Sequence, residues 1–554
     1  MATLNIFIGG DDFRILREEN RYYVDKTGLI EELLTSARPL VSLITRPRRF
    51  GKTLSMSMLR EFFDIQKDSR QLFEGLAVTK NTRLCDEWMN KYPVVFLSLK
   101  SIEGANYKEA LDQFCVLLRG ILANFESILS CPKASASDKA ILNQLYAGDQ
   151  NLSLLQNSLL ILSRALEAHY GKQVILLIDE YDVPINYAEQ NGYYNEMTGF
   201  MRNLLGAALK TNPSLKFAVL TGCLRIAKES IFTGLNNFRC YGISDDPYAD
   251  KFGFTSKEVD EMLVKAGLSH KKEAMKTWCD GYRFGNEEAI YCPWNVLLYV
   301  DDLQRNASAK PKAYWNNTSG NAIVRTLIAQ ASLEARQKVE DLIDGKAIEE
   351  NLAEDLTYDL VYDNESNIWS MMYLTGYLTK ALMQPDNDNT ALVIPNKEVR
   401  KIFTSTVTAW FLDTLKKRDL SMFVKALWNG DTAAIEKTLK QILYDTISYY
   451  DSKESYYHGF LTGLIRGAGL AIKSNREYGL GRTDITIEDG LNDRAIIIEL
   501  KIAPTYIDLD KKAEEALAQI EEKHYAEGLS PQIKTVCKYG MAFWRKVCCV
   551  KLAK

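Results

Sequence analysis

The chain has 554 residues, of which 46% are hydrophobic and 25% charged, and its formal net charge is −4 at pH 7. This length exceeds what one hydrophobic core can organise, so we expect two to four domains of ordinary globular composition. The net charge excludes a wholly basic nucleic-acid coat protein, although a local basic groove remains compatible with it.

The cysteines, the histidines and the N-terminus restrict the environment and the kinds of site. The ten cysteines form no CxxC pair, which favours reduced thiols and a cytoplasmic location. The N-terminus lacks the pattern of a signal peptide, and every apolar run is far shorter than a membrane span, so we expect no membrane segment. With only four widely spaced histidines, a catalytic metal would be held by carboxylates rather than by a histidine cluster.

Short apolar runs alternate with helical patterns in the first half of the chain. Such runs are typical of buried strands in a mainly parallel sheet that has helices on both faces. The strand candidates are residues 40–45, 94–100, 174–180 and 217–222.

A phosphate-binding pattern follows the first strand candidate. RPRRFGKT at 46–53 ends like the P-loop G-x-x-x-x-G-K-[ST], in which the lysine reaches the β- and γ-phosphates and the hydroxyl binds Mg²⁺. Gly51, Lys52 and Thr53 occupy these positions, but Arg46 stands where the first glycine belongs. The tripeptide alone is a weak signal, and its position between a strand and an amphipathic helix strengthens it. Arg46 and Arg49 would place cations near a bound triphosphate or serve an interface instead.

Polar side chains end the third and fourth strand candidates. Asp179 and Glu180 close the run ILLIDE, where P-loop NTPases hold Mg²⁺ and polarise the attacking water. The alternative is a strand that simply ends in solvated acids. Thr221 is a candidate γ-phosphate sensor, and Arg225 could contact phosphate or form a structural salt bridge.

From residue 252 to about 450 the pattern is mainly helical, and Thr255 with Glu258 fits a capping box. After residue 455 the pattern changes to a helix at about 454–470, a β-hairpin, a helix at about 508–526 and a strand pair near 534–550. The sequence therefore predicts a separate domain at the C-terminal end.

The predicted hairpin carries a set of charged residues that suits metal-dependent phosphodiester hydrolysis. DITIE and RAIIIELK are joined by EDGLND, and a turn centred near residue 491 would place Asp484 close to Glu499. Glu499 and Lys501 share a face, because strand side chains alternate. Asp484 and Glu499, with the carbonyl of Leu500, would hold Mg²⁺ or Mn²⁺. Lys501 would position or deprotonate the attacking water, or stabilise developing charge.

The order YYVDKT, LITRPRRFGKTLSMSML, VILLIDEYDVPI and LTGCLRIAKESIFTGLNNF resembles the bacterial AAA-ATPase-like proteins, which are related to archaeal-type and STAND ATPases. FGFTSKEV, CDGYRFG, YCPWNV and YWNNTSGN also look like this family, so the resemblance covers nearly the whole chain. An arginine-rich phosphate loop without the first glycine is usual in the family. The resemblance implies ATP binding and says less about turnover.

The C-terminal set is similar to the PD-(D/E)XK nuclease superfamily, which is commonly fused to such ATPases. Asp484, Glu499 and Lys501 stand at its motif positions, and Thr483 replaces the motif's proline.

Further residues of the C-terminal region fit this resemblance. Glu454 would supply an additional helical carboxylate, and Gln519 with Tyr525 matches a Q-x5-Y pattern that supports the active site. The alternatives are a solvated helix acid and ordinary helix-face residues. His458 is interpreted as structural.

The preferred hypothesis is a cytoplasmic, ATP-binding, metal-dependent nuclease of the α/β class, with DNA as the expected substrate. Its expected partners are ATP and nucleic acid, and a homo-oligomer is compatible with the sequence. The alternative is a nucleotide-switched signalling or interaction protein whose nuclease-like domain does not cleave. The predicted domains are an AAA-like P-loop ATPase with a mainly parallel sheet at 1–250, a helical lid and linker region at 251–450, and a restriction-endonuclease-like α/β domain at 451–554.

Overall fold

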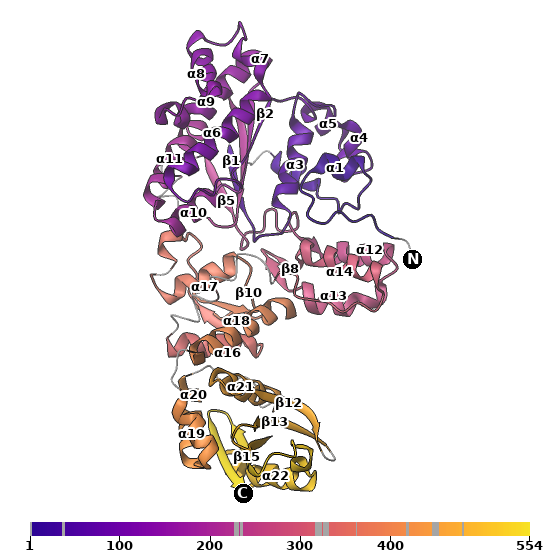
Figure 1. Ribbon diagram of the computed structural model, residues 1–554. Coiled ribbons are helices and arrows are strands. Elements are labelled where there is room, and N and C mark those ends of the chain that lie inside the picture. Colours follow the sequence, from indigo (N-terminus) through magenta and orange to yellow (C-terminus); the bar gives the residue numbers. More distant parts are fainter. Residues whose placement is uncertain are drawn as a thin grey trace. The chain divides into compact units, whose positions relative to one another are not determined.

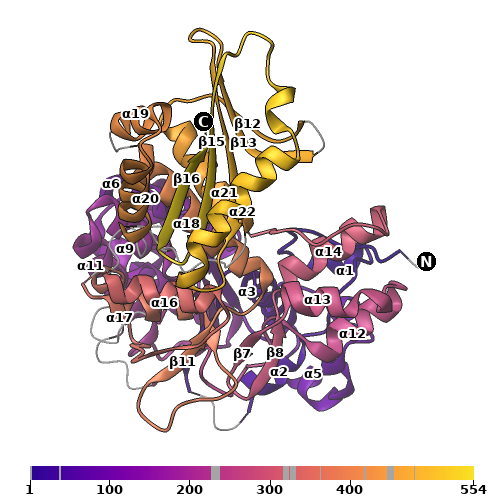
Figure 2. The ribbon, with the colours of Figure 1, turned by 90° about the horizontal axis from the view of Figure 1, so that it is seen from below.

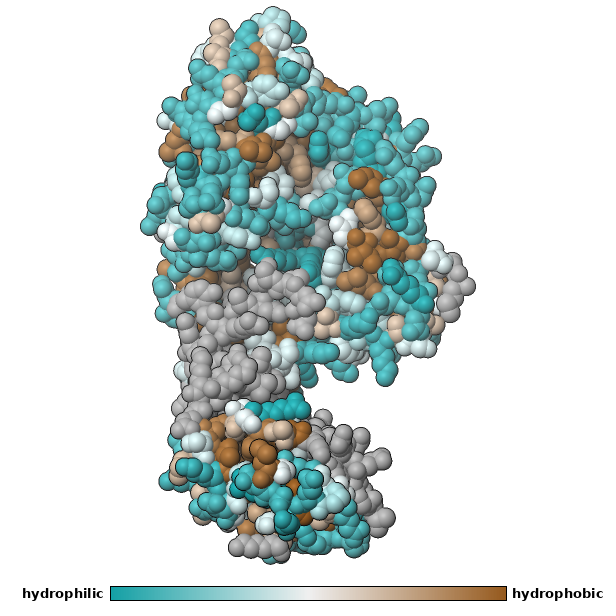
Figure 3. Space-filling model, in the orientation of Figure 1, coloured by the Kyte–Doolittle hydropathy of each residue, from teal (hydrophilic) through white to brown (hydrophobic). Residues whose placement is uncertain are grey.

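The computed structural model describes residues 3–35, 39–225, 232, 237–315, 324, 332–361, 363–416, 420–445, 454–478 and 481–553. Within these ranges, the side chains of 333, 336, 408–416, 444–445, 454–456, 473–478 and 481–482 are not described. The chain divides into two compact units, Met1–Thr318 with Ala347–Lys401, and Ser319–Lys346 with Ile402–Lys554. On the face that Figure 3 shows, hydrophilic residues cover most of the coloured surface, and hydrophobic residues form separate areas.

A five-stranded parallel sheet organises the first unit, in the order β2-β3-β4-β1-β5. The strands are β1 (Val41–Thr45), β2 (Val94–Ser98), β3 (Val174–Asp179), β4 (Leu215–Gly222) and β5 (Phe238–Tyr241). Every residue of β1 and β3 is buried, as expected of strands that are covered on both faces. The four predicted strands are confirmed. The sequence reasoning missed β5, since its four residues are too few to show a periodic pattern.

Helices cover both faces of this sheet (Figure 1). α3 (Lys52–Phe63) contacts β2, β3 and β4 and lies beside α1 (Phe13–Glu18), whereas α6 (Tyr107–Ala123), α9 (Leu152–Tyr170) and α11 (Tyr194–Leu209) cover the opposite face. Apolar residues at helical spacing, such as Phe114, Leu118 and Ile121 of α6, explain this packing. The other helices of this part are α2 (Gly28–Leu33), α4 (Arg70–Phe73), η1 (Ala77–Lys80), α5 (Thr82–Trp88), α7 (Glu126–Leu129), α8 (Ala136–Ala147) and α10 (Val183–Asn191).

The rest of the first unit combines helices with two small sheets. The sheets have the orders β6-β8-β7 and β10-β11-β9. Thr255 and Glu258 form the predicted capping box at the start of α12. The strands are β6 (Phe254–Thr255), β7 (Tyr282–Phe284), β8 (Glu287–Tyr291), β9 (Ile348–Glu350), β10 (Thr379–Lys380) and β11 (Thr390–Val393). The helices are α12 (Ser256–Lys265), η2 (Ser269–Lys271), α13 (Lys272–Cys279), α14 (Pro293–Arg305), η4 (Tyr358–Leu360), α17 (Glu365–Leu374) and α18 (Lys397–Lys416), the last continuing into the second unit.

A mixed five-stranded sheet organises the second unit, in the order β12-β13-β14-β15-β16. β14 and β15 are parallel, and the other three pairs are antiparallel. α22 packs on one face of this sheet, and α19, α20 and α21 share the core on the other face (Figure 2). The strands are β12 (Ile472–Tyr478), β13 (Gly481–Asp489), β14 (Arg494–Ile502), β15 (Thr535–Trp544) and β16 (Val547–Ala553). The helices are α16 (Leu333–Ile343), α19 (Ser421–Asn429), α20 (Thr432–Asp445), α21 (Glu454–Gly467), η5 (Tyr506–Asp508), α22 (Leu509–Glu522) and η6 (Tyr525–Gly528).

The core of the second sheet extends to residues that precede the predicted boundary at 451. Leu427 of α19 and Leu439 of α20 belong to the same buried cluster as Met541 of β15. The hydroxyl of Tyr539 also donates a hydrogen bond of 2.6 Å to the carbonyl oxygen of Leu427. The structure therefore places α19 and α20 with the C-terminal sheet rather than in a separate linker.

A fragment of residues 451–554 should be much less stable than a fragment of residues 402–554. Removing α19 and α20 exposes apolar side chains that each contribute on the order of 2 kcal/mol when buried. Thermal unfolding of the two fragments, followed by circular dichroism, checks this expectation. Equal midpoints would show that the two helices are not part of the folding unit.

Candidate functional sites

The carboxyl ends of β1, β4 and β3 bring three predicted nucleotide-site residues into contact. The Thr53 hydroxyl donates to Oδ2 of Asp179 at 2.8 Å, and the Thr221 hydroxyl donates to Oδ1 at 2.5 Å. Asp179 is fully buried. These contacts arise because β4 lies between β1 and β3, so the ends of all three strands meet at one edge.

The loop before α3 surrounds Lys52. The Lys52 ammonium donates to the carbonyl oxygens of Arg46 and Pro47, each at 3.0 Å, and lies 3.6 Å from the sulfur of Cys223. Gly51 has a φ of 85°, a left-handed conformation that glycine adopts without strain. The chain thus turns sharply into α3, and the loop holds the Lys52 ammonium beside the N-terminus of this helix.

Glu180, the acid after Asp179, has an unusual backbone. Its φ of 51° lies in the left-handed region, which non-glycine residues seldom adopt outside turns and functional sites. Burial raises the pKa of its carboxyl group, the neighbouring Asp179 raises it further, and Lys52 partly offsets both effects. A raised pKa makes a carboxylate a better proton acceptor, as a general base requires.

Asp484, Glu499 and Lys501 lie together on the α22 side of the second sheet. The register of β13 and β14 pairs Ile485 with Ile498, so Asp484 lies opposite Glu499, as the predicted turn requires. Lys501 Nζ lies 3.6 Å from Oε1 of Glu499, whose side chain is buried. Two carboxylates and one ammonium therefore share one small region.

Side chains from α22 and η6 support Glu499. The Gln519 amide donates to Oε1 of Glu499, and the same nitrogen donates to the Tyr525 hydroxyl at 3.3 Å. Tyr525 is buried in the same cluster as Ile497 of β14. Gln519 thus contacts Glu499 directly, and Tyr525 contacts Gln519.

Backbone and helix contacts fix Asp484. The Leu500 N–H donates to Oδ2 of Asp484 at 2.9 Å, and Nε2 of His458 lies 2.9 Å from the Asp484 backbone oxygen. Burial raises the pKa of the Asp484 carboxyl group, and the Leu500 hydrogen bond and the charges of His458 and Lys501 partly offset this. His458 thus holds the strand that carries Asp484, which agrees with its interpretation as a structural residue.

Comparisons with known proteins match both regions. Residues 7–232 match the model of the AAA-ATPase-like family, described as a predicted AAA-ATPase, and residues 452–552 match the model of the PD-(D/E)XK nuclease superfamily. We refer to these two matched regions as the AAA-ATPase-like domain and the nuclease-superfamily domain. It is also similar to a protein of Azotobacter chroococcum mcd 1, described as an uncharacterized protein in the vnfD 5′ region. The two are 25% identical over 562 residues, which cover 98% of this chain and 97% of the relative.

Arg46 of the AAA-ATPase-like domain is fully buried, and its contacts are with the protein itself. The rings of Phe252 and Phe284 lie 5.5 and 5.3 Å from the guanidinium, and burial lowers its pKa to about 10. Arg46 thus connects the loop to β5 and the segment after it. The guanidinium donates at 2.8 to 3.0 Å to the carbonyl oxygens of Thr45, Tyr241, Gly242 and Tyr248.

The other two candidate arginines of this domain also contact protein groups. The Arg49 guanidinium lies 4.6 Å from the centre of the Trp294 ring, and Arg225 forms an ion pair of 2.6 Å with Asp355. Arg225 therefore adopts the salt-bridge alternative that the sequence left open. Arg49 lies in the loop with its side chain turned toward α14.

The donor set of the nuclease-superfamily domain fits a hard divalent cation. Asp484 and Glu499 present carboxylate oxygens, the ligands that Mg²⁺ prefers, and a cation would offset the cost of burying Glu499 and half-burying Asp484. Within the described residues, no group of three or more Asp, Glu, His or Cys side chains gathers as a metal site. Backbone oxygen and water would therefore complete the coordination. Glu454 begins α21, but its side chain lies outside the described residues.

A buried acid that the sequence reasoning missed lies near the phosphate loop. Glu398 is fully buried at the start of α18, where it accepts hydrogen bonds from the Asn295 amide at 2.6 Å and the Trp315 N–H at 2.5 Å. Burial raises the pKa of its carboxyl group to about 7, and the nearby Arg49 partly offsets this. In sequence, NKEVRK resembles an ordinary charged helix start, so only the surrounding fold identifies this residue.

The stability of the protein should fall between about pH 5 and about pH 8 because of Glu398. Its folded pKa of about 7 exceeds the ordinary value of 4.5, so the stabilisation is complete below the lower value and is lost as the pH rises through the higher one. The difference between the two pKa values of Glu398 corresponds to roughly 3 kcal/mol in the free energy of unfolding. Urea unfolding at both pH values should show the loss in the wild type and in an exposed control, Glu349→Gln, but not in Glu398→Gln. The same loss in Glu398→Gln would contradict the assignment.

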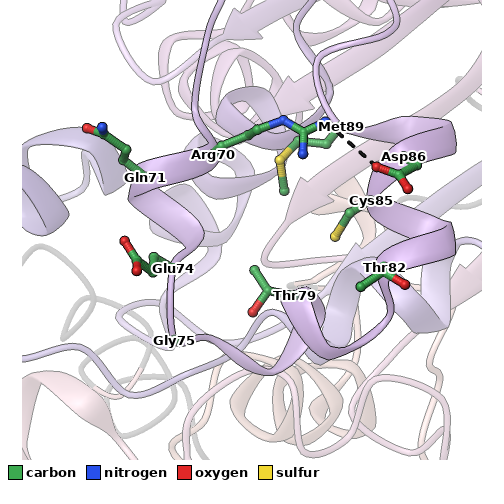
Figure 4. A pocket seen from close by; sticks show the side chains of 9 residues that line it. All are labelled: Arg70, Gln71, Glu74, Gly75, Thr79, Thr82, Cys85, Asp86 and Met89. Atoms are coloured by element: carbon green, nitrogen blue, oxygen red, sulfur yellow. Dashed lines mark ion pairs between the residues drawn. The ribbon is translucent and has the colours of Figure 1, made fainter.

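A surface cavity of about 350 Å³ lies between α4 and α5, and it contains none of the predicted site residues (Figure 4). Arg70 extends toward Asp86 along its rim, with 3.7 Å between the charged atoms. Burial raises the pKa of the Cys85 thiol, which lowers its reactivity at neutral pH. These residues offer no evident catalytic chemistry.

Among the described helices, none is both long and apolar enough to cross a membrane.

Proposed function

We propose that the protein binds ATP·Mg²⁺ in its AAA-ATPase-like domain and cleaves nucleic acid, with DNA as the expected substrate, in its nuclease-superfamily domain. The observation that carries this proposal is the grouping of Asp484, Glu499 and Lys501 on one face of β13 and β14, with Gln519 bound to Glu499. This grouping has the charges and donors that phosphodiester hydrolysis needs.

Each residue of the nuclease site has a distinct role in the proposal. Asp484 and Glu499 would hold Mg²⁺ or Mn²⁺ together with the Leu500 carbonyl oxygen, and the cation would supply water activation and charge neutralisation. Lys501, next to Glu499, would orient the attacking water or accept its proton. The Leu500 N–H and Gln519 keep the two carboxylates in place before substrate binds.

The nucleotide site is proposed from the contacts around Asp179. Lys52 would exchange its loop carbonyl partners for the β- and γ-phosphates, and Thr53 and Asp179 would hold Mg²⁺. Thr221, bound to the same carboxylate, would report the γ-phosphate, and Glu180 would polarise the attacking water. In this proposal, ATP regulates the nuclease.

Cleavage of labelled DNA and RNA by the full-length protein tests the function. The reactions contain Mg²⁺, Mn²⁺ or a chelator, each with and without ATP. The proposal expects cleavage that requires a divalent cation, prefers DNA and changes with ATP. If no condition gives metal-dependent cleavage while nucleic acid still binds, the non-cleaving interaction protein becomes the better interpretation.

A further inference from the structure

A pair of large apolar side chains projects into solvent immediately after the strand that carries the proposed nuclease site. Tyr506 is 61% exposed and Ile507 is 88% exposed, and both belong to η5. β14, which carries Glu499 and Lys501, ends only a few residues earlier. Exposed apolar groups that lie together cost solubility, so a partner is expected for them.

The turn that carries these side chains is held in one conformation. The Thr505 hydroxyl donates to the Asp508 carboxylate at 2.6 Å, and the Asp508 N–H donates to the Thr505 carbonyl at 3.2 Å. The Ala503 N–H donates to the carbonyl of Phe543 at 2.9 Å, which attaches the start of the loop to β15. These hydrogen bonds therefore fix the backbone that carries Tyr506 and Ile507.

An aromatic and a cationic group from the neighbouring hairpin complete the surface. The ring centres of Tyr506 and Trp544 lie 6.0 Å apart in an edge-to-face arrangement, and the Arg545 guanidinium lies 4.9 Å from the centre of the Trp544 ring. We name Tyr506, Ile507, Trp544 and Arg545 the stacking surface. It combines exposed aromatic and apolar area with a positive charge, which is the combination on which unpaired bases stack.

The stacking surface lies on the same side of the sheet as the proposed catalytic residues. Lys501 pairs with Ala542 in the parallel register of β14 and β15, so Trp544 lies two residues further along on the same face. Two strand residues span about 7 Å, so a nucleotide near Lys501 could have a neighbouring base at Trp544. α22 covers this same side of the sheet, and Leu509 at its start packs near Trp544.

We propose that the stacking surface binds unpaired bases of single-stranded nucleic acid and thereby selects single-stranded or frayed substrates for the nuclease-superfamily domain. The inference rests on the proposed nuclease function, because selecting substrates matters only if the domain cleaves them. Paired bases are stacked within their own duplex and hide their faces, so they would gain little from this surface.

Binding to labelled oligothymidylate in the presence of a chelator tests the inference without any cleavage. We expect the full-length double variant Tyr506→Ala/Ile507→Ala to bind it about tenfold more weakly than wild type, and Tyr506→Trp to keep the affinity. Binding to a duplex of equal length should change little. Leu491→Ala is a matched control, because Leu491 is 98% exposed at the opposite end of β14.

Three results would overturn the inference. They are unchanged oligothymidylate binding by the double variant, equal weakening for the duplex, and an effect of the double variant on self-association alone, which would identify a second copy as the occupant. An oligouridylate arm tests whether an RNA strand, which carries the 2′-hydroxyl and lacks the thymine methyl group, also binds in a way that depends on Tyr506. Binding that depends on Tyr506 without any metal-dependent cleavage would defeat the nuclease proposal and leave the stacking surface standing.

Discussion

Glu499→Gln should lower metal-dependent cleavage on the order of a thousandfold or more. The substitution keeps the size of the side chain and an oxygen that can accept from Gln519, but it removes the negative charge on which cation binding relies. Such a loss corresponds to several kcal/mol of transition-state stabilisation. Single-turnover cleavage with saturating Mg²⁺ or Mn²⁺ measures it.

A stability measurement separates this effect from misfolding. Glu499 is buried, so replacing its charge with a neutral amide should leave the thermal midpoint unchanged or raise it. Glu514→Gln is the matched control, because it removes a carboxylate from the exposed side of α22. Wild-type cleavage by Glu499→Gln would show that any observed nuclease activity comes from elsewhere.

Arg46→Gly should destabilise the first unit on the order of 5 kcal/mol, even though it restores the glycine of the common phosphate-loop pattern. The substitution would leave four buried carbonyl groups without their donor, and each such loss typically costs about 1–3 kcal/mol. The volume left by the guanidinium would add to this cost. Urea unfolding of the full-length protein, followed by tryptophan fluorescence, measures the change.

Lys52→Ala and Arg225→Ala separate folding from nucleotide binding. Lys52→Ala should abolish ATP binding with a smaller effect on stability than Arg46→Gly. Arg225→Ala should cost at most about 1 kcal/mol, because it breaks only a partly exposed ion pair. An Arg46→Gly protein that folds as stably as wild type and binds ATP more tightly would reverse the structural interpretation of Arg46.

Local pattern was sufficient for the residues whose neighbours follow from strand geometry. The turn near residue 491 and the alternation of strand side chains determine that Asp484 faces Glu499 and that Lys501 shares its side. The Thr53–Asp179 contact follows similarly from parallel strands whose ends share an edge. In each case, the geometry of turns and of regular sheets is sufficient to predict that the two side chains are neighbours.

Long-range contacts were beyond the reach of such rules. Arg46 binds carbonyl groups about 200 residues later in the chain, and nothing in RPRRFGK indicates that its first arginine turns inward. The same holds for Glu398, whose partner Asn295 lies 103 positions away. The cost of burying a charge depends on what surrounds it in three dimensions, so a single sequence does not reveal it.

The division of the chain has a consequence for how the two units can be separated. The backbone passes between them three times, between residues 318 and 319, 346 and 347, and 401 and 402. A protease that cuts at one crossing leaves two covalent connections, and a gene segment that begins at 402 leaves residues 319–346 of the same unit behind. The second unit is therefore not encoded by one continuous gene segment that a single exchange could replace.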